Sequence, residues 1–434
     1  MQASERTSGG AAGPSPTTAA GRGRLAVCPA CDWVMRLPDL APGESAHCPR
    51  CERRVATARR GGHQAEIALS VACLILLAMA LPFDFLGFET RGADRDIVLL
   101  DTAAALFDYR YVFLGALVAA TTVVLPALYL SIALYLSAGL ALDRPLPGAR
   151  LLGHALQPIR PWLMSDVFLV GVLVSLVKIV SLAEIRLGPS FLAFGIYAVL
   201  FLQTLTLFEH RRFWERFGEG GGLPRTLTAG RPAAAQGLRA CASCEHPAPA
   251  DGRCPQCGRR HAGVGFDRIE ATWALLLAAA ILYVPANVYP IMRTDWLGDS
   301  RPSTIVGGVL QLVDSGSWPI AAVIFTASIV VPIGKIAALA WLCLCARSHR
   351  PRGRRTNMRL YRLTEVIGRW SMIDVFVVAV LAALVRSGHI VSVHPGPAAA
   401  AFAAVVILTM IAAMTFDARL IWEPDDGRRR RVPA

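Results

Sequence analysis

The chain has 434 residues, enough for several soluble domains, but its composition argues against a soluble protein. Hydrophobic residues make up 54% of the chain, and the mean hydropathy is +0.47. The apolar residues gather in blocks nearly free of charge, each close to the about 20 residues that a helix needs to cross a bilayer. We predict eight transmembrane helices, near residues 67–88, 111–142, 162–182, 190–208, 271–292, 319–346, 370–386 and 398–416.

The net charge of +13 could suggest nucleic-acid binding, but the distribution of arginine indicates a membrane instead. A cytoplasmic amino terminus places most of the arginines in the inner connections and tails, which is the positive-inside pattern. We therefore predict that both termini are cytoplasmic and that the chain does not bind nucleic acid. The run Arg428–Arg431 is then expected to contact anionic lipid headgroups.

The chain opens with a Gly/Ala/Pro/Thr/Ser-rich leader, residues 1–24, which has no apolar core of signal-peptide type and is expected to be disordered. A first ribbon follows, in which Cys28-x-x-Cys31 and Cys48-x-x-Cys51 are separated by 16 residues. Four thiolates from two tight turns close a tetrahedral shell around zinc and leave no position for a substrate. The spacing predicts a structural zinc site. Rubredoxin-type iron and thiol redox chemistry are the alternatives, and a reducing cytosol disfavours disulfides.

The first group of four predicted helices contains two ionisable residues in its third helix. Asp166 falls near the cytoplasmic end, where a carboxylate is favoured by the positive end of the helix. Lys178 falls toward the outer end, where its side chain could reach the interface. Because ionisable groups inside a membrane are costly, both residues are also candidates for a role in transport.

A second ribbon precedes the second group of helices. Its pairs Cys241-x-x-Cys244 and Cys254-x-x-Cys257 are separated by nine residues. The pattern again predicts four thiolates around one zinc ion. Finding the motif twice in one chain strengthens the prediction of two structural zinc sites.

The second group of helices carries the more polar interior. Of the 44 basic Lys and Arg residues only two are lysines, Lys178 and Lys335, and Lys335 lies deep in the sixth predicted helix. Asp374 could pair with Lys335, since two facing charges neutralise one another where neither is stable alone. A polar track could extend from this pair through Ser371, Ser328 and Thr409.

The fifth predicted helix ends in V-P-A-N-V-Y-P-I, residues 284–291. Pro285 and Pro290 interrupt the hydrogen-bond ladder there, and Asn287 must find a partner. We predict an opened helix, a feature tolerated only where protein or a cavity covers the freed carbonyls.

Self-comparison reveals an internal repeat. W-L-M-S-D-V-F-L-V from Trp162 matches W-S-M-I-D-V-F-V-V from Trp370 at an offset of 208, and Pro126 matches Pro332 at 206. The predicted fold is an all-α polytopic membrane protein with two tandem four-helix transmembrane bundles of the same orientation, each preceded by a small cytoplasmic zinc ribbon. The predicted segments are the leader 1–24, ribbon 25–60, first module 65–215, linker 216–238, ribbon 239–262, second module 268–422 and basic tail 423–434.

Four motifs together resemble the paraquat-inducible protein A family: P-A-N-V-Y-P, V-V-P-I-G-K, W-S-M-I-D-V-F and a final F-D-A-R-L-I-W, beside the ribbons. The resemblance extends from Cys28 to Trp422. It implies a bacterial inner-membrane protein that works with a membrane-anchored periplasmic MCE-domain protein in phospholipid transport. The first half departs from the pattern, because L-A-M-A-L-P-F replaces its Asn-containing segment.

We therefore expect a membrane subunit, without enzymatic activity, that passes phospholipid to or from an MCE tunnel. No Walker A loop is present, so the hypothesis includes proton movement through the region of Lys335 and Asp374. An ion-coupled small-molecule transporter and a membrane thiol redox protein are the alternatives. The second bundle is expected to carry the function, with the first as its packing partner.

Overall fold

The computed structural model is mostly helical. It describes residues 24–58, 62–90, 93–179, 184–208, 210–222, 227–261, 266–296, 299–314, 316, 318–347, 353–384 and 391–422. Most of the leader and the basic tail with Arg428–Arg431 lie outside these residues.

Two small ribbons hold the cysteine motifs. The first ribbon consists of the antiparallel pairs β1–β2 and β3–β4, and the second ribbon of β8–β9 and β10–β11. Their strands are β1 (Arg24–Val27), β2 (Val34–Leu37), β3 (Ser45–His47), β4 (Arg54–Thr57), β8 (Leu238–Ala240), β9 (Pro247–Pro249), β10 (Gly252–Arg253) and β11 (Arg260–His261).

The first half of the helical region lies between the ribbons in the chain. Within it, α1 packs against α4 and α7, and α6 packs against α7. Its elements are α1 (Gly62–Met79), β5 (Asp84–Thr90), β6 (Ala93–Val98), α2 (Asp101–Asp108), α3 (Val112–Ala119), the π-helix η1 (Ala120–Val124), α4 (Leu125–Ala141), α5 (Ala149–Ile159), η2 (Arg160–Trp162), α6 (Ser165–Ile179), β7 (Glu184–Leu187), α7 (Pro189–Leu207) and α8 (His210–Phe217).

The second half follows the second ribbon. Here α9 packs against α15 and α12, and α13 packs against α12 and α15. Its elements are α9 (Phe266–Val288), β12 (Met292–Trp296), β13 (Asp299–Ser303), α10 (Ile305–Asp314), α11 (Trp318–Phe325), the π-helix η4 (Thr326–Val330), α12 (Val331–Arg347), α13 (Arg354–Trp370), α14 (Ile373–Leu384), β14 (Val391–Pro395), α15 (Pro397–Thr415) and η5 (Ala418–Ile421). A short 3-10 helix, η3 (Ala234–Gln236), precedes the second ribbon.

Both halves contain a π-helical turn just before a proline. The turns η1 and η4 end directly before α4 and α12, in which Pro126 and Pro332 are the second residues. A proline cannot donate to the carbonyl four residues earlier, and its ring crowds that carbonyl, so the preceding turn widens. The two widened turns stand 206 residues apart, as the prolines do.

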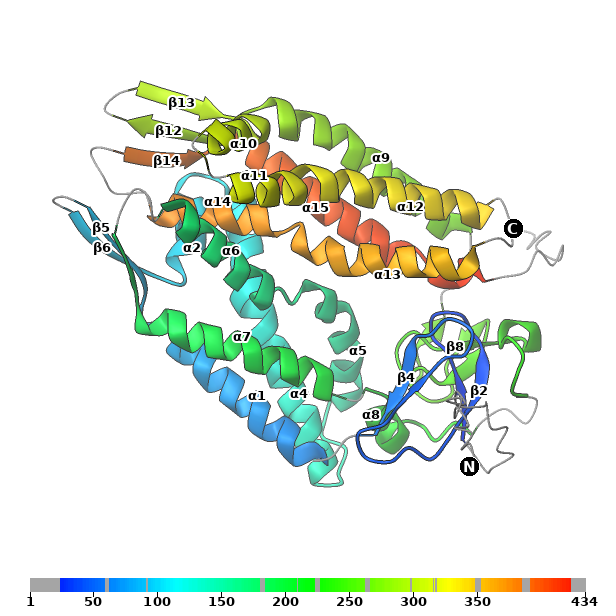
Figure 1. Ribbon diagram of the computed structural model, residues 1–434. Helices are drawn as coiled ribbons and strands as arrows, with labels where there is room; N and C mark the ends of the chain where they lie inside the picture. Colours follow the sequence, from blue (N-terminus) through cyan, green and yellow to red (C-terminus); the bar gives the residue numbers. More distant parts are fainter. Residues whose placement is uncertain are drawn as a thin grey trace, which may run out of the picture.

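The prediction of an all-α fold is wrong at the end of the helices opposite to the ribbons. Two three-stranded sheets lie there, one ordered β6-β5-β7 and the other β13-β12-β14, and Figure 1 shows both at the left of the molecule. The apolar residues of β5 follow the first apolar block without a break in the sequence, so hydropathy alone extended the helix into the strand.

Within the described residues, seven helices are long and apolar enough to cross a membrane, not eight. The exception is α1, whose apolar part His63–Met79 is shorter. It ends before Pro82, which lacks the N–H that another helical turn requires. The fifth predicted span ends earlier than expected, because α9 ends at Val288, close to Pro290.

The two halves meet along α6 and α14. The rings of Phe168 and Phe376 lie 5.4 Å apart at an interplanar angle of 82°, an edge-to-face contact. Beside them, a Cβ added to Gly171 would lie 2.9 Å from Cβ of Phe376. Glycine at position 171 therefore allows the close approach of the two helices.

Candidate functional site: two thiol clusters and a buried polar region

The four cysteines of each ribbon converge on one point. Sγ atoms of Cys28 and Cys51 are 3.5 Å apart, and those of Cys31 and Cys48 are 3.6 Å apart. In the second ribbon the corresponding distances are 3.6 and 3.5 Å. Zinc bound to four thiolates at about 2.3 Å requires sulfur separations of about 3.8 Å. All the sulfurs of a cluster lie within 4.8 Å of one another, so either cluster could hold a metal ion.

A repeated turn places these thiols. The residue after each Cys-x-x-Cys pair has a positive φ: 51° at Asp32, 62° at Glu52, 59° at Glu245 and 72° at Gly258. Each of these residues donates its backbone N–H to the first cysteine of its pair, at 2.8–2.9 Å. The left-handed residue closes a tight turn, which directs both thiols of the pair to the same side.

The four cysteine thiols of each cluster are suited to binding a divalent cation. Hydrogen bonds from Cys28 and Cys31 lower the pKa of the Cys48 thiol to about 7, whereas contact with Cys28 and Cys48 raises the pKa of Cys31. Four thiols that face only one another cannot all ionise. A bound divalent cation removes that obstacle, because it neutralises closely spaced thiolates.

The first ribbon docks on the second half of the helical region. Arg362 of α13 donates to the carbonyl of Cys51 at 2.6 Å, and Arg50 donates to the carbonyl of Trp422 at 3.3 Å. The Arg50 guanidinium also lies over two indole rings, 5.2 Å from the centre of Trp33 and 4.7 Å from that of Trp422. The cysteines of this ribbon share one apolar core with residues of α9, α12, α13 and α15.

The second ribbon docks on the first half instead. His154 of α5 lies 3.1 Å by Nε2 from the carbonyl of Cys257 and 2.7 Å by Nδ1 from Oγ of Ser243. Since a carbonyl only accepts, the proton belongs on Nε2, and Nδ1 accepts from the serine. Gln256 donates to the carbonyl of Trp214 in α8. The expectation that each ribbon simply precedes its own bundle missed this crossed packing.

A buried ion pair between Asp32 of the first ribbon and Arg419 of η5 lies where the two ribbons meet. The Asp32 carboxylate accepts from the backbone N–H of Ala240 at 3.1 Å and lies 3.7 Å from the guanidinium of Arg419. Arg419 also donates to the carbonyls of Ala240 and Pro29, at 3.0 and 3.3 Å. Burial raises the pKa of Asp32, and the charge of Arg419 opposes that shift. Arg419 belongs to the F-D-A-R-L-I-W motif, so that motif connects the end of the second half to both ribbons.

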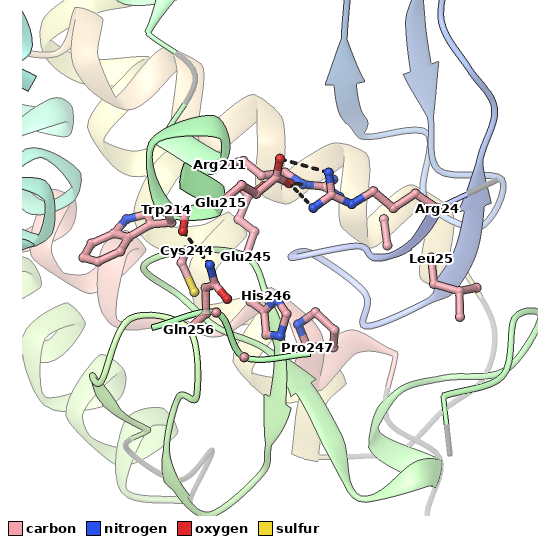
Figure 2. A pocket seen from close by; sticks show the side chains of 13 residues that line it. Arg24, Leu25, Arg211, Trp214, Glu215, Cys244, Glu245, His246, Pro247 and Gln256 are labelled. Atoms are coloured by element: carbon pink, nitrogen blue, oxygen red, sulfur yellow. Dashed lines mark hydrogen bonds and ion pairs between the residues drawn. The ribbon is translucent and has the colours of Figure 1, made fainter. Parts of the chain in front are cut away.

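A cavity of about 270 Å³ opens where β1, α8 and the second ribbon meet, and Figure 2 shows its lining. Two guanidinium groups, of Arg24 and Arg211, face the same carboxylate there, that of Glu215, at 2.8 and 2.9 Å. Because one carboxylate already engages both cations, the arrangement explains how the ribbon meets α8 and does not by itself define a ligand site.

The second half buries the predicted polar residues on several helices. Lys335 of α12 is 3% exposed, and its Nζ has no hydrogen-bond partner among the described residues. The ammonium lies against α13, since a Cβ added to Gly368 would be 2.8 Å from it. Buried beside these helices are Ser328, Ser371, Asp374 and Thr409.

The expected contact between Lys335 and Asp374 is not observed. Among the described residues, Nζ of Lys335 has no hydrogen-bond partner, so Asp374 does not bond to it. Asp374 is the second residue of α14, whereas Lys335 faces Gly368 on α13. Thr409 donates to the carbonyl of Val406 in its own helix, at 2.9 Å. The sequence identified which residues are buried but not how they pair.

The predicted opening of the fifth span is also wrong. Pro285 lies inside α9, which continues to Val288, and Asn287 donates to the carbonyl of Tyr283 in the same helix at 2.9 Å. The helix ends there because residues before a proline disfavour helical backbone.

Tyr283 is a polar residue that the sequence reasoning missed. Its hydroxyl lies 3.5 Å from the carbonyl oxygens of Ser328 and Ile329 in η4. Pro332 has no N–H to offer the Ser328 carbonyl, so the tyrosine supplies the donor. A signal was present, because Tyr283 and Asn287 are four residues apart on one face of a helix.

The two candidates in the first half differ from each other. Asp166 accepts two hydrogen bonds from Arg369 of the second half, at 2.8 and 3.0 Å, so it belongs to the seam between the halves. Lys178 falls in the last turn of α6, and its side chain lies outside the described part of the structure.

Fold and sites together define a multi-pass membrane protein with two four-cysteine clusters that could hold metal ions. The chain belongs to the paraquat-inducible protein A family, whose model matches residues 63–218 and 269–425. The family predicted from the sequence motifs is thereby confirmed.

Named relatives cover nearly the whole chain. It is 39% identical over 398 residues to "Intermembrane transport protein PqiA" of Escherichia coli K12, covering 92% of this chain and 95% of that protein. It is 30% identical over 418 residues to "Lipophilic envelope-spanning tunnel protein A" of the same strain, covering 94% of each. A "Probable intermembrane transport protein" of Haemophilus influenzae is 29% identical and covers 94% of this chain and 97% of its own length. No solved structure matches the chain.

Proposed function

We propose that this chain is the inner-membrane subunit of an intermembrane lipid transport system and passes phospholipid to or from a membrane-anchored periplasmic MCE-domain protein. The names of its relatives support intermembrane transport, and one of them includes an envelope-spanning tunnel. In this proposal both termini and both ribbons are cytoplasmic, each ribbon holds one structural zinc ion, and the chain is not an enzyme. The two strand-bearing ends of the helical halves then face the periplasmic partner.

The observation that carries the proposal is the burial of Lys335, which is 3% exposed among the helices of the second half. An ionisable group inside a membrane is expensive, and such groups mark substrate or proton pathways. The only other lysine of the chain is Lys178, so Lys335 is an exception to a composition that uses arginine almost everywhere. We propose that Lys335 takes up and releases a proton during lipid transfer. Asp374 and the hydroxyl groups of Ser328, Ser371 and Thr409 would carry the proton further.

Substitutions around Lys335 test the proton step. Lys335→Met keeps the length of the side chain and removes its charge, and Gly368→Ala displaces the ammonium because the added Cβ meets Nζ. Both variants should lower phospholipid transfer between vesicles by at least tenfold. Gly334→Ala is the matched control, since a Cβ at Gly334 has nothing within 4 Å. Normal transfer by Lys335→Met would exclude the proton step.

An ion-coupled small-molecule transporter is the second candidate, because internal repeats with buried charged residues also occur in such proteins. Purification from the native membrane separates the two. Mass spectrometry should detect phospholipid and an MCE-domain protein in the purified sample for the lipid function. A purified protein with neither, which accumulates a small solute in vesicles, would favour the second candidate.

A further inference from the structure

The two ribbon contacts described above are equivalent under the internal repeat. His154 on α5 reaches the carbonyl of Cys257, and Arg362 on α13 reaches the carbonyl of Cys51. The two helix residues are 208 positions apart and the two cysteines 206, which are the offsets of the repeat. In both halves, therefore, the same helix position binds the last cysteine of a cluster, and in both the ribbon comes from the other half.

A second pair of contacts repeats the pattern. Gln256 donates to the carbonyl of Trp214, and Arg50 donates to the carbonyl of Trp422. The donors precede the last cysteine of each cluster by one residue, and the acceptors occupy equivalent tryptophans. The residue types differ at the two donor positions, one on the helix and one in the ribbon, whereas the accepting cysteines and tryptophans are the same in both halves. The crossed geometry is nevertheless the same.

These contacts depend on the shape of the cysteine turn. The carbonyl of the last cysteine and the donor before it belong to the turn that also presents two thiols to the metal. Without the metal, no bond at the centre of the cluster connects the two cysteine turns and fixes their shape. The carbonyl would no longer be held against its helix on the opposite half.

We infer that each metal site holds the ribbon-side helices of the opposite half in position. The two sites together would then connect the two halves. The metal of the first ribbon fixes α13 and η5, and the metal of the second ribbon fixes α5 and α8.

Hydrogen exchange of the full-length protein in detergent, measured by mass spectrometry, tests whether each metal site stabilises the helices of the opposite half. Cys254→Ser should raise exchange about tenfold in α5 and α8 and leave α13 unchanged, because two hydrogen bonds are lost on the first half only. Cys48→Ser should do the reverse, with faster exchange in α13 and η5. Faster exchange in the half that follows the damaged ribbon in the chain would overturn the inference, as would no change in either half.

Contact variants keep the test decisive if a cysteine variant does not fold. His154→Ala and Arg362→Ala leave all eight thiols in place and should loosen α5 and α13, respectively. Leu151→Ala and Arg355→Ala are their controls on the same helices, because both side chains are exposed. Equal exchange in a contact variant and its control would also overturn the inference.

Discussion

Arg369, near the end of α13 in the second half, donates two hydrogen bonds to Asp166 at the start of α6 in the first half, at 2.8 and 3.0 Å. The same guanidinium donates to the carbonyl of Leu163 at 3.0 Å. The side chains are 33% and 27% exposed, so water screens the pair only partly. A carboxylate in the first half is thus held by a cation of the second half.

Removal of this ion pair should weaken the interface between the two halves. We expect Asp166→Asn and Arg369→Gln each to lower the melting temperature by about 2 °C, for a contribution of about 1 kcal/mol. The double variant should be little worse than either single variant, because each substitution breaks the same contact. Thermal unfolding of the purified protein in detergent measures this, and additive losses would show that the two residues act separately.

The sequence could not reveal this pair, although it identified much of the rest. Residue spacing alone gave both thiol clusters, because a Cys-x-x-Cys turn is local. Hydropathy located most of the long helices. The partner of Asp166 is far away in the chain, and the position equivalent to Arg369 in the first half is Pro161, so the repeat contained no hint of it. The crossed ribbons were missed for the same reason, since tertiary contacts decide which half a ribbon covers.

Metal analysis should find about two zinc ions per chain, one for each four-cysteine cluster. Cys48→Ser and Cys254→Ser should each reduce the content to about one, because three thiolates hold zinc less tightly than four. Cys345→Ser is a suitable control, since Cys345 belongs to neither cluster. Elemental analysis of the purified protein decides the matter, and iron in place of zinc would contradict the predicted metal.

Arg419 and Arg211 are equivalent in the repeat but differ in their surroundings. Arg419 is 12% exposed and lies 3.7 Å from the buried Asp32, whereas Arg211 is 26% exposed and pairs with Glu215 one helical turn away. Arg419→Ala should cost about 3 kcal/mol, because it leaves a buried carboxylate without its cation. Arg211→Ala should cost about 0.5 kcal/mol. Comparison of the two melting temperatures tests this, and equal losses would contradict the central role of Arg419.

Glycine at position 171 should be essential to the contact of α6 with α14. Gly171→Ala places a Cβ 2.9 Å from Cβ of Phe376, so the helices must separate, at about 1–3 kcal/mol. Gly195→Ala on α7 is the control, because nothing lies within 4 Å of its Cβ and alanine favours a helix by about 1 kcal/mol. The first variant should melt at a lower temperature and the second at the same or a higher one. A Gly171→Ala protein as stable as the parent would mean that the seam can shift freely.

The hydroxyl of Tyr283 should matter only while Pro332 is present. Tyr283→Phe leaves the Ser328 carbonyl without the donor that replaces the missing proline N–H, at a cost of about 1 kcal/mol. Pro332→Ala restores a backbone N–H in the same place, so the additional loss of the tyrosine hydroxyl should then have little effect on stability. A double-mutant cycle on melting temperature measures the coupling. If Tyr283→Phe were equally harmful in both backgrounds, the hydroxyl would serve something other than the carbonyl freed by the proline.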